Sequence, residues 1–226
     1  MNRTVIIAID GPGASGKGTL ARRLAAHLGY AYLDTGAMYR AVALQMLCAG
    51  EDPSDARAAL IAAQNLDTRL MDDPLLRTDI VGDAASRVAA YEDVRQALMV
   101  FQRSFATNPP GKLPGAVLDG RDIGTVICPD AGVKLFVTAS QEARAHRRYL
   151  ELAQRGEAAN EAKVLTELQV RDSRDQTRSV APLRAAPDAI VLDTTDMAIE
   201  DAFSAALAAV ASKIAMSGKP DHSQGA

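Results

Sequence analysis

The sequence predicts an α/β fold in which helices cover both faces of a largely parallel sheet. Short apolar runs rich in valine and isoleucine alternate with longer stretches of helical periodicity, which is typical of strand–helix–strand units. Alanine, the residue with the highest helix propensity, occurs 43 times among the 226 residues. Because domains usually hold ~100–200 residues, this length suits one domain with a small inserted lobe.

The first half of the chain begins with a strand and a helix joined by glycines. Val5–Asp10 is apolar and β-branched, and in Lys17–Leu28 the residues Leu20, Leu24 and Leu28 fall four apart, as on one helix face. The elements expected next are an extended piece at 30–33, helices from Gly36 to about Ala49 and from Pro53 to about Asn65, an irregular segment at 66–77, and helices at 79–90 and 92–105.

The second half of the chain continues the alternation without an internal repeat. A loop at 108–115 is rich in proline and glycine, which end helices and strands. The elements expected after it are strands at 116–119 and 133–138, helices at 140–156 and 161–178, a strand at 189–193 and a helix at 199–216. Residues 217–226 have the composition of a disordered tail.

Composition excludes several classes of protein. The 25 lysines and arginines against 28 aspartates and glutamates leave a net charge of −3, which excludes a protein held on a nucleic acid polymer by bulk positive charge. Arginine outnumbers lysine 19 to 6; either genome composition or phosphate binding explains this count. Cys48 and Cys128 form no ligand pair and predict free thiols. With no signal-peptide core and no run of ~18–20 apolar residues, we expect a cytoplasmic protein away from the membrane.

The clearest motif follows the first strand and opens the first helix. Its glycines let backbone N–H groups turn toward an anion, and the helix N-terminus adds partial positive charge. Lys17 adds a full charge for the β- and γ-phosphates, and because Gly18 replaces the usual serine or threonine, the Thr19 hydroxyl is expected to help place a magnesium ion. The residues of this ATP-binding P-loop are Gly11, Pro12, Gly13, Ala14, Ser15, Gly16, Lys17, Gly18 and Thr19.

A P-loop alone leaves several enzyme classes open. A GTPase would carry an Asn-Lys-x-Asp element for guanine, which the sequence lacks. A motor or remodelling ATPase would carry an apolar run ending in Asp-Glu, whereas Asp119 is followed by Gly120. The size and these absences favour a kinase of small molecules.

Three clusters lie where such a kinase needs acceptor contacts. Arg40 falls one turn into a helix, the segment 119–125 follows a buried strand, and Arg171, Asp175 and Arg178 share one helix face. An exposed helix arginine, a plain turn and a solvated ion-pair ladder would look the same. A further helix carries Arg144, Arg147, Arg148 and Arg155 and is expected to be a lid over the phosphates.

Together these motifs resemble the bacterial cytidylate kinases (CMP/dCMP kinases) of the P-loop nucleoside-monophosphate kinase family, from Val5 to about Met216. The resemblance rests on segments 35–40, 120–125, 144–148 and 171–183 in the family's order. It implies a three-layer P-loop kinase fold and a monomeric enzyme that transfers phosphate in line from ATP, with Mg²⁺, to CMP and dCMP. Its partners would be these nucleotides.

The resemblance also implies roles for single residues. Arg40, Arg121 and Arg178 correspond to ligands of the acceptor phosphate, and Arg171 and Asp175 to contacts on the sugar. The other acceptor residues are Thr35, and Ser86, Arg95 and Asp122 as readers of cytosine; Arg148 is assigned to ATP, and Lys17, Arg121, Asp122 and Arg178 to catalysis. A carboxylate accepts from the amino group of cytosine and an arginine donates to its ring acceptors, whereas uracil reverses this pattern.

The resemblance finally divides the kinase domain, 1–216, into parts. The core comprises 1–50 and 114–216, the monophosphate-binding insertion about 51–113, and the lid about 144–160. The insertion is helical and shortened, because only 71–75 remains of the hairpin that family members usually carry there. A related kinase of AMP or UMP, and a nucleotide-binding regulatory module without turnover, remain alternatives.

Overall fold

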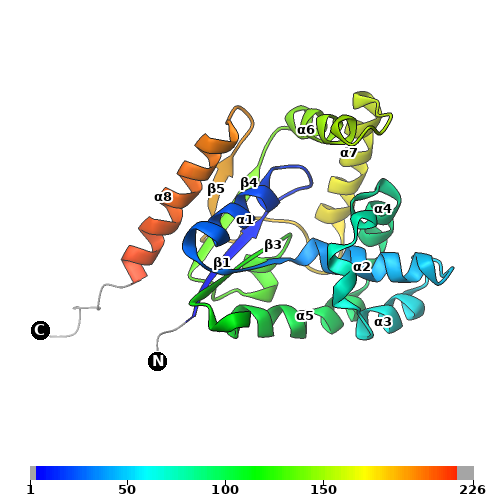
Figure 1. Ribbon diagram of the computed structural model, residues 1–226, viewed down its shortest axis with the longest axis horizontal. Helices are drawn as coiled ribbons and strands as arrows, with labels where there is room; N and C mark the ends of the chain where they lie inside the picture. Colours follow the sequence, from blue (N-terminus) through cyan, green and yellow to red (C-terminus); the bar gives the residue numbers. More distant parts are fainter. Residues whose placement is uncertain (1–3, 218–226) are drawn as a thin grey trace, which may run out of the picture.

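The computed structural model describes residues 4–217 and has the predicted α/β architecture. Five strands form one sheet in the order β2-β3-β1-β4-β5, and every neighbouring pair is parallel (Figure 1). The strands are β1 (Val5–Asp10), β2 (Ala31–Asp34), β3 (Gly115–Gly120), β4 (Val133–Thr138) and β5 (Ile190–Asp193). Because all run the same way, their carboxyl ends meet at one edge, where α/β sheets bind ligands.

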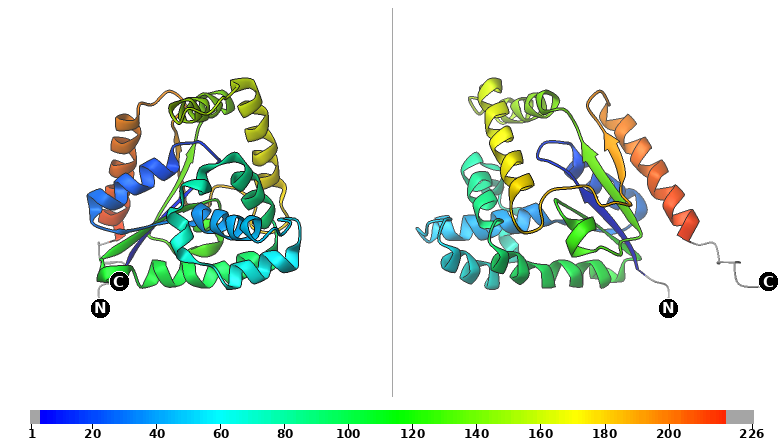
Figure 2. Two further views of the ribbon diagram at one scale, coloured as in Figure 1. Left: turned by 45° about the vertical axis from the view of Figure 1, so that its right-hand side comes forward. Right: turned by 180° about the vertical axis from the view of Figure 1, so that it is seen from behind.

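Helices cover both faces of this sheet, as the two sides of the molecule in Figure 2 show. On one face α1 (Lys17–Leu28) and α8 (Ile199–Ser217) pack on Ile7 and Ile9 of β1. On the other face lie α2 (Thr35–Cys48), α3 (Ala56–Gln64), α4 (Asp79–Val88) and α5 (Glu92–Thr107), around a core that includes Ala8 and Leu118. β1 and β3 are thus covered on both sides, which explains their continuous apolar sequences.

Two further helices stand beyond the carboxyl ends of the strands. α6 (Gln141–Gln154) follows β4, and α7 (Glu161–Thr177) packs on α6 and returns toward α4 (Figure 1). Their small apolar cluster includes Leu152 and Leu168 and contacts Ala14 of the P-loop. These helices therefore stand over the edge of the sheet where a ligand would bind.

The structure corrects several boundaries. The segment expected to be irregular, 66–77, forms two 3₁₀ turns, η1 (Thr68–Asp72) and η2 (Pro74–Arg77), because Asp67 and Asp73 cap them. The loop at 108–115 contains a third, η3 (Pro110–Lys112). Asp55 caps α3, which therefore begins at Ala56 and not at Pro53.

The prediction of a disordered tail is wrong at its first residue, since α8 includes Ser217; residues 218–226 lie outside the described part. A π-helical turn that was not predicted, η4 (Ile123–Ile127), follows Arg121 and Asp122. No helix within residues 4–217 is long and apolar enough to cross a membrane.

Candidate active site

A cavity of about 980 Å³ opens at the carboxyl ends of the strands. The P-loop, α2, α4, α6 and α7 all contribute to its wall. Twelve residues predicted for the site line it: Gly13, Ala14, Ser15, Gly16, Lys17, Gly18, Thr19, Arg40, Ser86, Arg121, Arg148 and Arg171. Residues predicted for the donor and for the acceptor therefore share one cavity.

The P-loop owes its shape to close backbone packing. A Cβ on Gly11 would lie 2.0 Å from the carbonyl oxygen of Val137, so only glycine fits there. Gly16, at the start of α1, has a φ of 84°, in the left-handed region that favours glycine. Lys17 lines the cavity, and burial together with the nearby charge of Arg121 lowers its pKa to about 7.

Asp119 is a residue of this region that the predicted site did not include. It is the second-last residue of β3, and Tyr32 Oη donates to its Oδ1 over 3.0 Å. Its Oδ2 lies 3.3 Å from the place where a Cβ on Gly18 would stand, and burial with the charge of Asp34 raises its pKa to about 6. The signal in the sequence was its position as the last residue of a predicted buried strand, at the carboxyl end where α/β sheets bind ligands.

Positive charge converges on the acceptor side of the cavity. Arg40, Arg121, Arg148 and Arg171 come from α2, the loop after β3, α6 and α7. Only Arg121 is tied to a buried carboxylate in this group, through a 2.9 Å contact of its Nε with Asp175. Burial and the charge of Arg121, with smaller effects of Arg40 and Arg148, lower the pKa of Arg171 to about 10, and its Nε has no partner in the described structure. Such a cluster favours binding of an anion.

Of the residues assigned to the base, Ser86 lines the cavity, whereas Arg95 and Asp122 lie outside its wall. Arg95 of α5 forms a buried ion pair with Asp122, and Arg178 Nη2 lies 3.9 Å from the other oxygen of Asp122. The Oγ of Ser86 is buried and finds no hydrogen-bond partner among the described residues. The structure thus brings together three predicted residues that lie far apart in the sequence. Asp122, Arg95 and Arg178 are not in the cavity wall.

Several side chains of the predicted site and lid bond to other parts of the protein in this structure. The Thr35 hydroxyl donates to the carbonyl of Asp119 over 2.8 Å, so it is buried and occupied. Arg144 pairs with Asp172 over 2.7 Å and donates to the carbonyl of Gly13, and Arg147 donates to Thr194. The guanidinium groups of Arg144 and Arg147 therefore hold α6 against neighbouring parts of the protein, and Arg147 also lines the cavity.

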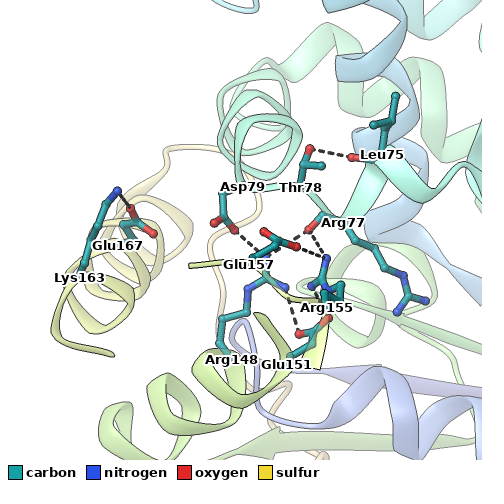
Figure 3. A network of polar contacts seen from close by, with 10 residues as sticks. All are labelled: Leu75, Arg77, Thr78, Asp79, Arg148, Glu151, Arg155, Glu157, Lys163 and Glu167. Atoms are coloured by element: carbon teal, nitrogen blue, oxygen red, sulfur yellow. Dashed lines mark hydrogen bonds and ion pairs between the residues drawn. The ribbon is translucent and has the colours of Figure 1, made fainter. Parts of the chain in front are cut away.

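Arg148 of α6 and Arg155, which directly follows α6, contact the end of η2 and the first residue of α4, as Figure 3 shows. Arg148 donates to Asp79 over 2.6 Å and to the carbonyl of Arg77 over 3.2 Å. Arg155 reaches the same carbonyl over 3.1 Å, and Glu151 pairs with both arginines. Arg148 lines the cavity, and in this structure its charge is directed at Asp79.

The comparisons with known proteins identify the family. Residues 7–212 match the family model described as cytidylate kinase. The chain belongs to the cytidylate kinase family. It is 58% identical to a cytidylate kinase of Rhodospirillum rubrum over 92% of this chain and 98% of that protein, and 59% identical to one of Rhodopseudomonas palustris over 90% and 94%. Membership confirms the predicted resemblance and the prediction that the chain is an enzyme, a phosphotransferase.

Solved structures agree with the fold of this family. A putative kinase of Chloroflexus aurantiacus matches with a TM-score of 0.53 at 18% identity, over 97% of this chain and 100% of that one. A gluconokinase of Sinorhizobium meliloti matches with a TM-score of 0.50 at 15% identity, also over 97% and 100%. These likenesses support the predicted P-loop kinase fold and carry no information about the acceptor.

Proposed function

We propose that this enzyme transfers the γ-phosphoryl group of ATP reversibly to CMP and dCMP. The observation that carries the proposal is the convergence of Lys17, Arg40, Arg121 and Arg171 on one cavity, between a P-loop and a buried cluster able to read a base. Two polyanions that must approach each other need such a surplus of positive charge between them.

The reaction needs no general base from the protein. The nucleophile is an oxygen of the CMP phosphate, which is already largely ionised near neutral pH. Catalysis then consists of placing donor and acceptor in line and neutralising the charge of the transferring group. Lys17 and the P-loop amides act on the donor phosphates, Arg40, Arg121 and Arg178 on the acceptor phosphate, and Arg171 and Asp175 on the sugar.

Asp122, Arg95 and Ser86 supply the polar groups expected to read cytosine. Asp122 accepts from the amino group, Arg95 donates to the ring acceptors, and the unpartnered Ser86 hydroxyl is free to join them. Because Arg95 and Asp122 already pair with each other, they are held in place before the base arrives. Uracil would set an oxygen against the carboxylate and leave buried polar groups unpaired, which disfavours UMP.

The donor side suits Mg²⁺, a cation that binds oxygen ligands. Thr19 lines the cavity, and Asp119 holds a carboxylate oxygen close to Gly18. We propose that the Thr19 hydroxyl and Asp119 would hold the ion or its bound waters. When bound, Mg²⁺ neutralises charge on the donor phosphates and fixes their orientation.

The division of labour in the chain is part of the proposal. Residues 51–113 would form the monophosphate-binding insertion, and about 144–160, which includes most of α6, the lid that brings Arg148 to ATP. The core would comprise 1–50 and 114–216. We further propose that the enzyme acts as a monomer in the cytoplasm.

A panel of monophosphates tests this function. ADP release from Mg-ATP would be followed with CMP, dCMP, UMP, AMP and GMP as acceptors. We expect the highest kcat/KM with CMP and dCMP. Higher kcat/KM with AMP or UMP would make the chain a kinase of another monophosphate, and ATP binding without ADP formation in the presence of any acceptor would favour a regulatory module.

A further inference from the structure

The π-helical turn η4 connects directly to two residues of the candidate site. Asp122 precedes its first residue, and Asp122 O accepts hydrogen bonds from Val126 N and Ile127 N over 2.9 and 3.2 Å. Any shift or rotation of η4 would therefore move the backbone that carries Asp122 and, one residue earlier, Arg121. π-helical turns are rare and frequently lie at functional sites.

Asp10 holds the N-terminal end of this turn. Its Oδ1 accepts from Ile123 N and its Oδ2 from Gly124 N, each over 2.8 Å. The two amides begin a helical turn and have no partner within it, so a carboxylate suits them in hydrogen bonding and in charge. Asp10 is buried and directly precedes Gly11, the first residue of the P-loop. One side chain thus links the start of the donor loop to the acceptor residues.

Arg103 of α5 holds the other end of the turn. Its Nε donates to the carbonyl of Ile127 over 2.9 Å and its Nη2 to that of Val126 over 3.0 Å. Carbonyls at the end of a helical turn carry partial negative charge, and a guanidinium donates to both at once. Asp10 and Arg103 therefore bond to opposite ends of η4, and each lies at the end where its charge is favourable.

We propose that Asp10 and Arg103 are positioning residues for base selection: they clamp η4 and thereby fix Asp122 and Arg121 relative to the P-loop. This rests on the proposed function, in which Asp122 reads cytosine. Both oxygens of Asp10 and two guanidinium nitrogens of Arg103 bond to the backbone of η4, so both side chains act through η4 and not by contact with a nucleotide. The design of the clamp predicts an effect on acceptor use and selectivity with little effect on ATP binding.

Arg103 offers the cleaner test because it is exposed, so its replacement leaves no buried charge. Arg103→Gln removes both the positive charge and the guanidinium group that donates to two carbonyls at once. Arg103→Lys keeps the charge but can donate well to only one of the two carbonyls. Asp10→Asn replaces one of the two oxygens that accept from the η4 amides with a donor. Arg69→Gln is the matched control, since Arg69 is an exposed arginine paired locally with Asp67. Asp122→Asn is the reference for loss of base reading.

The measurements are kcat/KM for CMP and for UMP, the Kd for ATP and the Tm of each variant. We expect Arg103→Gln to lower the CMP-to-UMP ratio of kcat/KM about tenfold, since displacements of about 1 Å at a reacting centre cost up to ~100-fold. The ratio for Arg103→Lys should lie between the ratios for Arg103→Gln and wild type. Asp10→Asn, if it folds, should lower the ratio at least as far as Arg103→Gln does. ATP Kd should stay within about twofold in Arg103→Gln, and Arg69→Gln should match wild type.

The reference variant separates failure of the clamp from failure of the proposed function. If Asp122→Asn lowers the ratio and Arg103→Gln changes only the Tm, the clamp is overturned and base reading by Asp122 stands. If Asp122→Asn keeps the wild-type ratio, base reading by Asp122 is wrong and the positioning role is overturned with it. A parallel loss for CMP and UMP in Arg103→Gln, with the ratio unchanged, would also overturn the clamp.

Discussion

Removing Arg144 should destabilise the protein far more than removing any exposed arginine. Arg144 and Asp172 are buried, with side chains 4% and 6% exposed, and their charged groups lie 2.7 Å apart. Arg144 also donates to the carbonyls of Ala139 and Gly13 over 3.0 and 3.2 Å. The substitution Arg144→Met would leave a buried carboxylate and two carbonyls without this donor.

The structure sets the expected magnitude. Breaking a buried ion pair by removing one partner costs ~3–5 kcal/mol, because the remaining charge stays buried and unpaired. One oxygen of Asp172 already lacks a partner among the described residues, so little else can compensate. We expect Arg144→Met to lower the free energy of unfolding by ~3–5 kcal/mol. The double variant Arg144→Met/Asp172→Leu should regain at least ~1 kcal/mol, since it removes the stranded charge.

Urea denaturation followed by far-ultraviolet circular dichroism measures both effects, and this probe suits a chain without tryptophan. Arg23→Gln is the control, because Arg23 pairs with an exposed Glu200 and such pairs contribute ~0–1 kcal/mol. A loss in Arg144→Met no larger than in the control would refute the reasoning. A double variant less stable than Arg144→Met would also refute it, because removing the unpaired carboxylate of Asp172 would then have destabilised the protein instead of stabilising it.

Three further predictions concern the candidate site. Lys17→Ala should lower kcat by ~100-fold or more while the Kd for CMP changes less than about threefold, because its charge acts on the donor phosphates; a larger effect on CMP binding than on kcat would contradict the assigned role. Burial beside Arg121 lowers the pKa of Lys17 to about 7, and only the protonated amine attracts phosphate, so ATP affinity should fall as pH rises above about 7. Calorimetry in buffers of different ionisation enthalpy should detect proton uptake on ATP binding at pH 8 in wild type and less in Lys17→Met. Asp79 is half exposed and pairs with Arg148, which we assign to ATP. Asp79→Asn should free Arg148 and lower the KM for ATP by ~2–5-fold, which is the scale of an exposed ion pair. An increased KM would show that the contact instead prepares the site for ATP.

Much of the fold could be predicted because its signals are local. The apolar run of β1, the glycines of the P-loop and the leucine spacing of α1 each lie within a few residues, and the structure confirms all three elements. Boundaries were missed where a short side chain decides the local backbone. Asp55, Asp67 and Asp73 cap α3, η1 and η2 by accepting from amides two or three residues ahead, and composition alone did not separate such caps from loop aspartates.

The candidate site was predicted unevenly for the same reason. Lys17 and Gly16 could be placed from their motif, since the phosphate loop is contiguous in the chain. Arg144 and Arg148 have the same local sequence character, one turn apart on α6, yet one is buried against Asp172 and the other faces the cavity. Residues four apart share one face of a helix, so the two arginines differ in their position along α6 and not in the side they occupy. Which turn of that face is covered depends on how α7 packs against α6, and no short segment encodes that packing.

The residues alone were enough to predict the parallel α/β fold and the phosphate loop, because strand and helix periodicity and a nine-residue loop are properties of neighbouring positions. The kinase family was indicated by the resemblance of several short motifs, each of them also local in the chain. Tertiary structure decided which charges face which. It paired Arg95 with Asp122 across 27 positions, left Arg171 without a partner for its Nε, and joined Asp10 to η4 across more than 110 positions. Electrostatic energy depends on distance in space and on burial, and both become defined only when the sheet and its helices have assembled.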